Sequence, residues 1–148
     1  MFMNKLVVLF FFILIIAFLA SNYINIYKNY IVSEIVDGDT FKTKDGKTVR
    51  LIGINAPEIG EPCSQEAKNK LNEIIYRREI RLERDSGNKD AYGRLLRYVY
   101  VGDLFVNAEM VRLGLAKFEE IEPNKKYSKL FLGLENKARN AGRCMWES

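Results

Sequence analysis

The hydrophobic residues form one unbroken run near the start of the chain and short alternating or periodic groups after it. Residues 6–20 are fifteen consecutive apolar residues, and the first thirty residues carry only two charges, Lys5 and Lys28. An apolar run of this kind predicts a hydrophobic helix. The mixed pattern that follows predicts a folded domain. We therefore divide the chain into an N-terminal segment, residues 1–27, and a domain, residues 28–148.

The N-terminal segment has the features of a transmembrane anchor and some of those of a signal peptide. With the weakly polar residues after the run it reaches 22 residues, 6–27, and a span needs about 20. A secretory signal also begins with a basic residue such as Lys5, but its cleavage site needs small residues. Cleavage after Ala20 would place the bulky Phe18 at the third position before the cut, so we favour the uncleaved membrane anchor over a secreted product. The positive charge ahead of the run predicts a domain outside the cytoplasm.

The first part of the domain predicts three consecutive strands. Residues 31–36, 40–43 and 48–54 are rich in β-branched residues or alternate between apolar and polar side chains. Residues 37–39 and 44–47 separate them and have the Asp and Gly composition of tight turns. The three strands are therefore expected to form a meander in which neighbours in sequence pair side by side.

The second part of the domain predicts further strands mixed with helices. Apolar positions over residues 64–78 recur at helical spacing. Residues 79–83 and 94–101 predict two more strands, Asn107 predicts the cap of a short helix, and residues 127–141 predict a last helix. Five short strands with inserted and appended helices predict an α+β fold built on a small barrel.

Composition and charge exclude several kinds of site. The chain has 23 basic and 19 acidic residues and no histidine, and 21 of the basic residues lie in residues 31–148. This near balance gives no large basic field, so charge alone does not predict a nucleic-acid partner. The lack of histidine excludes histidine acid–base pairs, histidine zinc ligands and Ser-His-Asp triads, and two cysteines cannot form a four-thiolate metal site. Catalysis is left to carboxylates, Arg, Lys, Tyr or a hard metal ion.

Asp39 and Asn55 give the first indication of a metal site. They stand at the ends of the first and third predicted strands, which a meander places side by side. A carboxylate, an amide oxygen and a backbone carbonyl near the rigid Pro57 are oxygen ligands of the kind that a hard divalent cation prefers.

Motifs in four separate parts of the domain resemble the staphylococcal nuclease (thermonuclease) family. They are residues 36–40, 50–58, 90–94 and 106–116, in the order of the family, and the likeness extends over residues 30–147. The resemblance implies an OB-fold-type five-stranded barrel with three helices, here preceded by the hydrophobic N-terminal helix. It also implies calcium-dependent hydrolysis of phosphodiester bonds in DNA or RNA, and we expect the protein to be a monomer.

The resemblance also implies roles for individual residues. Asp39 corresponds to the metal carboxylate, with Asn55 and the carbonyl of Ala56 as further oxygen ligands. Thr40 corresponds to a residue beside these ligands, and Tyr92 to one that lines the nucleotide pocket.

Three further residues correspond to the catalytic groups of the family. Arg50 and Arg94 match the guanidinium groups that hold the scissile phosphate, and Glu58 matches the carboxylate that orients or deprotonates the attacking water. The chemistry needs such groups because negative charge accumulates on the phosphate oxygens during attack. An Arg side chain is a permanently charged fork that can bind two of these oxygens.

The chain departs from the family pattern at positions that affect metal and substrate binding. Asn55 stands where family members often carry Asp, so a cation would meet one negative charge fewer. Glu120 stands where the secreted prototype has tyrosines that stack on the base, which weakens single-strand binding. A catalytically weak or inactive nucleic-acid-binding module held at the membrane is therefore the alternative. The presence of both arginines and both acidic residues of the expected site favours an enzyme.

The two cysteines are a candidate disulfide. Cys63 begins the first predicted helix of the domain and Cys144 follows the last, and on the fold of the family these two ends lie close together. In an exported domain, the oxidising environment would join the two thiols in a disulfide. Two buried free thiols are the alternative.

Overall fold

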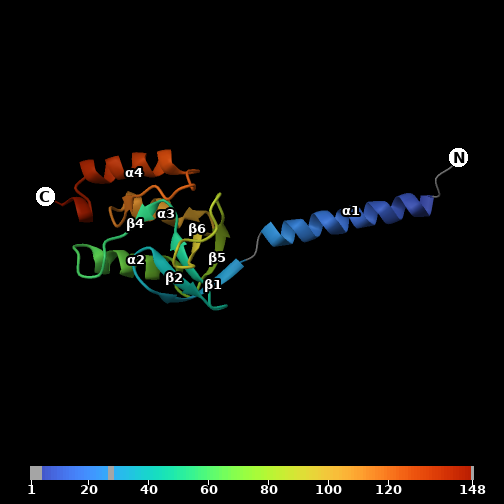
Figure 1. The fold of residues 1–148 in the computed structure, drawn as a ribbon, viewed down its shortest axis with the longest axis horizontal. Helices are drawn as coiled ribbons and strands as arrows, with labels where there is room; N and C mark the ends of the chain where they lie inside the picture. Colours follow the sequence, from blue (N-terminus) through green and yellow to red (C-terminus); the bar gives the residue numbers. More distant parts are fainter. Residues whose placement is uncertain (1–4, 27–28, 148) are drawn as a thin grey trace.

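A hydrophobic helix precedes the folded domain. The computed structural model describes residues 5–26 and 29–147, and α1 (Lys5–Ile26) lies apart from the barrel (Figure 1). Within these residues, no helix combines the length and the hydropathy that crossing a membrane requires. The transmembrane anchor predicted for residues 1–27 is therefore not supported. The predicted boundary between residues 27 and 28 lies outside the described residues.

Five strands close into a barrel. Their order is β3-β2-β1-β5-β6, and β3 also pairs with β6, which closes the sheet on itself. This closing pair is parallel, whereas the other four pairs are antiparallel. The barrel strands are β1 (Asn29–Ile35), β2 (Thr40–Thr43), β3 (Thr48–Leu51), β5 (Glu79–Glu83) and β6 (Leu95–Val101).

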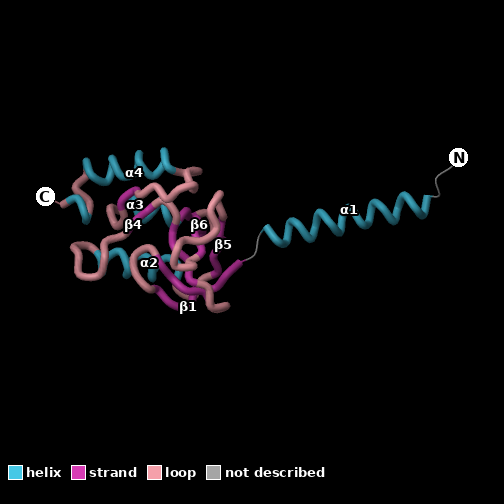
Figure 2. Tube along the Cα trace, viewed as in Figure 1, coloured by secondary structure: helices cyan, strands magenta, loops and turns pink. Residues whose placement is uncertain are grey.

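Helices and a small second sheet surround the barrel. The remaining elements are β4 (Ile54–Asn55), α2 (Ser64–Ile75), β7 (Leu104–Phe105), α3 (Val106–Arg112), β8 (Lys117–Phe118), α4 (Ser128–Asn140) and the 3₁₀ helix η1 (Cys144–Trp146). β4 pairs with β8 in the second sheet. In the view of Figure 2, α4 lies along the top of the domain and α2 lies below it. The α+β class and the five-stranded OB-type barrel with three helices are confirmed.

A turn divides the third predicted strand. The strand predicted over residues 48–54 forms β3, which ends at Leu51, and β4, which begins at Ile54. Between them, Gly53 has a φ of +77°, and a Cβ atom on it would lie 2.6 Å from the Phe131 ring. The chain therefore turns at Gly53, and β4 leaves the barrel to pair with β8.

The apolar face predicted for the first helix of the domain packs in the core. Its buried side chains are Ala67, Leu71, Ile74 and Ile75. They share one hydrophobic core with the inward-facing side chains of the barrel. The helix ends at Ile75 instead of residue 78, because Tyr76 is already extended, with a ψ of 128°, and Arg77 has a positive φ of 57° that a helix does not allow.

Asn107 does not cap a helix, which corrects the sequence-based prediction. α3 already begins at Val106, and the Asn107 side chain is fully buried. Its Nδ2 donates to the Ile52 carbonyl at 2.9 Å, and its Oδ1 accepts the Val99 N–H at 2.9 Å. The amide thus ties α3 to β6 and to the turn after β3, because it satisfies two buried backbone groups that need partners.

Candidate active site

The turn between β1 and β2 positions Asp39 at the end of the barrel. The Asp39 N–H donates to the Asp37 carboxylate at 3.0 Å. A Cβ atom on Gly38 would lie 2.6 Å from the Ala56 Cβ and 2.7 Å from the Ala67 Cβ. Only glycine allows so close an approach. The turn therefore packs directly against α2 and against the segment that follows β4.

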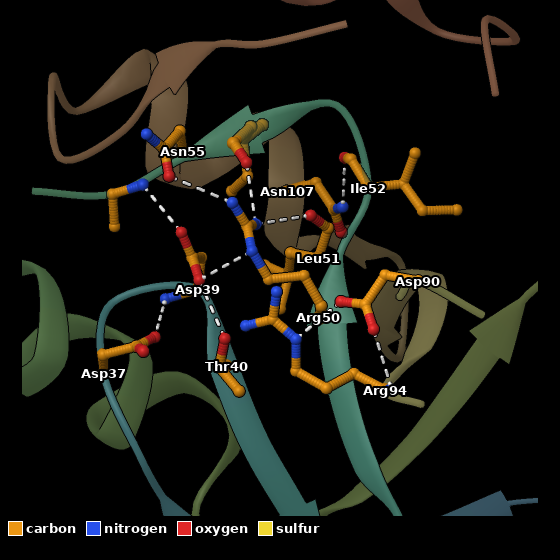
Figure 3. A network of polar contacts seen from close by, with 12 residues as sticks. Asp37, Asp39, Thr40, Arg50, Leu51, Ile52, Asn55, Asp90, Arg94 and Asn107 are labelled. Atoms are coloured by element: carbon orange, nitrogen blue, oxygen red, sulfur yellow. Dashed lines mark hydrogen bonds and ion pairs between the residues drawn. The ribbon is translucent and has the colours of Figure 1, made fainter. Parts of the chain in front are cut away.

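Asp39 is buried, and both of its carboxylate oxygens have partners (Figure 3). Oδ1 accepts the Thr40 hydroxyl at 2.9 Å and lies 3.1 Å from the Arg50 Nε. Oδ2 accepts the Ala56 N–H at 2.8 Å. The structure therefore places Thr40 and Ala56, two residues assigned to the site from the sequence, in direct contact with the expected metal carboxylate.

The charge of Asp39 depends on its surroundings. Burial raises the pKa of the Asp39 carboxyl to about 6, although the Arg50 guanidinium and the Ala56 N–H oppose this rise. The carboxyl is therefore mainly ionised at neutral pH and loses its charge in mildly acidic solution. A cation nearby would favour the charged form and lower this pKa.

Arg50, on β3, connects the oxygen donors of the site (Figure 3). In addition to its contact with Asp39, its Nη2 donates to the Asn55 Oδ1 at 3.0 Å. Its Nη1 donates to the Leu51 and Ile54 carbonyls at 2.8 and 2.7 Å. All three guanidinium nitrogens thus have protein acceptors. Arg50 is expected to hold a phosphate, and in this structure it also fixes the relative positions of Asp39 and Asn55.

Arg94 approaches the site from the loop before β6, where Asp90 orders it. The Asp90 carboxylate accepts the Arg94 Nε–H at 2.6 Å and the backbone N–H groups of Tyr92 and Arg94 at 3.0 Å each. Burial of Asp90 favours its neutral form, but the hydrogen bonds from Arg94 and Tyr92 outweigh burial and hold the pKa of this carboxyl below its usual range. The charged Asp90 therefore binds the Nε edge of the guanidinium, and the Nη groups have no hydrogen-bond acceptor in the part of the chain that the structure describes.

The predicted charged residues line one pocket of about 330 Å³, the central pocket. Its wall consists of Asp37, Asp39, Arg50, Asn55, Ala56, Pro57, Glu58, Arg94 and Glu119. Glu58 is exposed and stands at the start of the loop that leads to α2. Two guanidinium groups and the carboxylates of Asp39 and Glu58 therefore meet in the same cavity, although 55 positions separate Asp39 from Arg94 in the sequence.

Tyr92 lies beside the central pocket and not in it. Its side chain is 85% exposed and lines a neighbouring depression together with Lys47 and Lys89. Arg94 lines both cavities, and its guanidinium carbon is 5.4 Å from the centre of the Tyr92 ring. Tyr92, which was expected in the nucleotide pocket, thus lines a neighbouring cavity that is joined to the central pocket through Arg94.

Three residues of the site have no role assigned to them in the sequence analysis, although two of them stand within the motifs. Asp37 and Glu119 line the central pocket, and Asp90 orders Arg94. Asp37 and Asp90 each accept the N–H of the residue two positions later, a contact that Asp in a short turn commonly makes. Glu119 follows β8, and the pairing of β8 with β4 brings it to the pocket. A long-range pairing of this kind has no local sequence signal.

Cys63 and Cys144 form a disulfide. The bond joins the residue before α2 to η1, near the end of the domain. The loop that begins at Glu58 is therefore held in place by the disulfide at Cys63, five residues further along the chain.

The oxygen donors of the pocket suit a hard divalent cation in kind. Asp39 offers a carboxylate, Asn55 an amide oxygen and Ala56 a backbone carbonyl. No group of three His, Cys, Asp or Glu side chains that could hold a metal ion occurs among residues 5–26 and 29–147. These protein donors would therefore supply only part of a coordination shell, and water and a substrate phosphate would have to complete it.

Comparison with known proteins identifies the family. Residues 48–148 match the family model of staphylococcal nuclease homologues. The chain is 35% identical over 129 residues to the thermonuclease of Staphylococcus intermedius, and the aligned region covers 81% of this chain and 77% of the relative. It is 34% identical over 129 residues to the endonuclease YncB of Bacillus subtilis (strain 168), and here the aligned region covers 80% of this chain and 61% of the relative. The chain therefore belongs to the staphylococcal nuclease family.

Proposed function

We propose that this nuclease hydrolyses phosphodiester bonds of DNA or RNA in the central pocket, with Ca²⁺ as its cofactor. One observation carries the proposal: two guanidinium groups and the carboxylates of Asp39 and Glu58 line the same cavity. The positive groups suit a phosphate, and a nearby carboxylate suits a water that must lose a proton. The names of the related thermonuclease and endonuclease support the same class of substrate.

Asp39, Asn55 and the Ala56 carbonyl would hold the cation. When bound, it supplies positive charge to a phosphate oxygen and to the attacking water. Arg50 keeps the two side-chain oxygens in place through its contacts with both. Because Arg50 is already positive and beside Asp39, a second positive charge there is less favourable. We therefore expect the cation to bind weakly.

Arg94 and Glu58 act on the substrate in this mechanism. Asp90 binds the Nε edge of Arg94, so the two Nη groups can donate to two oxygens of the scissile phosphate. Glu58, at the pocket wall, accepts a proton from the water that attacks phosphorus. The negative charge that develops on the phosphate oxygens is stabilised by groups already in position.

The full chain should release acid-soluble nucleotides from single-stranded DNA with Ca²⁺ and should release none with EDTA. Glu58→Gln keeps the shape of the side chain but removes the base, and it should lower kcat by about 100-fold or more. Glu66→Gln, on the exposed start of α2, is the matched control and should retain the wild-type rate. Equal rates for the two variants would refute the role of Glu58.

The same assay distinguishes an enzyme from a binding module. Retention of DNA on a gel without cleavage, in Ca²⁺ as in EDTA, would support a module that has lost turnover. The ordered Arg94 side chain favours cleavage, because its Nη groups are held in position before a substrate arrives.

Asn55→Asp should lower the Ca²⁺ concentration for half-maximal activity by about tenfold, because ligand charge tunes calcium affinity. Asn55 Oδ1 accepts a hydrogen bond from Arg50, and an Asp side chain can keep this contact while it adds a negative charge. A Ca²⁺ titration of the cleavage rate measures the effect. Asn136→Asp, on the exposed face of α4, should leave the titration unchanged. An Asn55→Asp titration identical to that of the wild type would argue against a cation at this position.

A further inference from the structure

Two side chains of the domain are far more exposed than its other large hydrophobic residues. Within residues 29–147, Tyr92 is 85% exposed and Ile59 is 84% exposed, whereas the next, Leu132, is 49% exposed. Each of the first two lines a depression that shares wall residues with the central pocket. The most exposed apolar surface of the domain therefore flanks the candidate active site on two sides.

The depression around Ile59 adjoins the central pocket directly. We name it the Lys68 depression. It has a volume of about 310 Å³ and shares Asp37 and Pro57 with the central pocket. Its wall also includes Ser64, Gln65 and Lys68 of α2. The depression that Tyr92 lines together with Lys47 and Lys89, here named the Tyr92 depression, instead shares Arg94 with the central pocket. The two depressions therefore adjoin different parts of the wall of the central pocket.

An ordered turn holds Ile59 in its exposed position. The Glu61 N–H donates to the Glu58 carbonyl at 2.9 Å, and the Glu58 N–H donates to the Glu61 carboxylate at 2.8 Å. Cys63, two residues further, is fixed by the disulfide. Burial of an Ile side chain normally stabilises a protein. Its exposure on a structured turn beside a substrate pocket therefore points to a contact with the substrate.

Lys68 places an ammonium group in the wall of the depression, which also contains the Asp37 carboxylate. No acidic partner of Lys68 is found among the described residues, whereas Lys70 on the same helix lies 2.8 Å from Glu73. Asp37, the acidic side chain in the wall, already accepts the Asp39 N–H. A free ammonium group beside apolar surface matches a nucleotide, which has a negative phosphate and apolar sugar and base faces.

We propose that the Lys68 depression binds the nucleotide next to the scissile phosphodiester, on the side away from Tyr92. This inference rests on the proposed function, in which the scissile phosphate lies against Arg94. A polynucleotide continues on both sides of that phosphate, and the Tyr92 depression accounts for one side only. In the Lys68 depression, Ile59 packs against the sugar or base, and Lys68 pairs with the next phosphate of the strand.

Oligonucleotides with one cleavable linkage and phosphorothioates elsewhere test the proposal, because phosphorothioates keep the charge and resist cleavage. Two series lengthen the strand on the 5′ side or on the 3′ side of that linkage. Lys68→Ala should raise KM by about fivefold in one series only and should leave kcat unchanged. A change of this size corresponds to the loss of one exposed ion pair. Ile59→Ser should affect the same series. Lys129→Ala, on α4, removes an equal charge from a residue that lines none of the three cavities and should change neither series.

The outcomes separate the subsite from the proposed function. An unchanged KM for Lys68→Ala in both series, or an equal rise in both, would overturn the subsite. If the wild type cleaves nothing, the proposed function fails, and single-strand binding in EDTA decides the subsite by itself. There, Lys68→Ala should reduce the slope of log affinity against log salt by about 0.7. A slope equal to those of the wild type and Lys129→Ala would overturn the proposal.

Discussion

Arg94→Ala should lower kcat on single-stranded DNA by about 10²–10³-fold while the domain stays folded, the loss that follows removal of one preorganised donor at a reacting centre. Asp90 binds the Nε edge of the guanidinium at 2.6 Å, so the Nη groups are in place before the substrate arrives. Because the charge on the phosphate oxygens grows in the transition state, the loss should fall on kcat more than on KM. Steady-state kinetics with a defined oligonucleotide measures both constants.

Two further variants show whether geometry or charge is responsible. Arg94→Lys keeps the charge but lacks the planar fork and the Nε–H that Asp90 accepts, so it should recover only a small part of the rate. Arg84→Ala removes the same charge from an exposed residue outside the central pocket and should keep the wild-type kcat. A kcat for Arg94→Ala that matches the kcat for Arg84→Ala would remove Arg94 from the mechanism.

Loss of the Cys63–Cys144 disulfide should lower the free energy of unfolding by about 4–5 kcal/mol. The two cysteines are 81 positions apart, and a cross-link over so long a loop removes many conformations from the unfolded chain. The expected loss is a large part of the about 5–15 kcal/mol that stabilises a typical domain. Urea unfolding with and without a reductant measures it, as does the Cys63→Ala/Cys144→Ala double variant.

The double variant is also the control for this experiment. Its unfolding should not respond to the reductant, whereas the wild type should lose stability and gain about 2 Da in intact mass, one hydrogen for each sulfur of the bridge. A wild-type unfolding curve that the reductant does not shift would contradict the bond.

Most strands follow from local patterns, but the closure of the barrel does not. β2 and β5 occupy the predicted residues 40–43 and 79–83, because alternation and turn composition are local properties of a sequence. The parallel pair β3–β6 joins residues 49–51 to residues 95–97, and no turn signal specifies it. The number of predicted strands indicates a small barrel, but the parallel pairing that closes it follows only from the resemblance to the family.

The candidate site was predictable as a set of residues but not as a set of contacts. Motif order identifies six residues that line the central pocket. It does not reveal that Arg50 binds both Asp39 and Asn55, because these contacts depend on the conformations of side chains on β3, on β4 and in the turn before β2. Asn107 is a similar case. Asn is common at helix starts, and only the packing of α3 on the barrel shows that this amide bonds Ile52 and Val99.

The parallel pair that closes the barrel also determines when the protein can act. Arg50 on β3 is in register with Leu96 on β6, two residues after Arg94. The separation of the two guanidinium groups is therefore set by the pairing of segments that are made at different times during synthesis. A nascent chain whose β6 has not yet docked keeps its phosphate-binding groups apart. The producing cell would thus meet no working nuclease until the whole domain has been made and has folded.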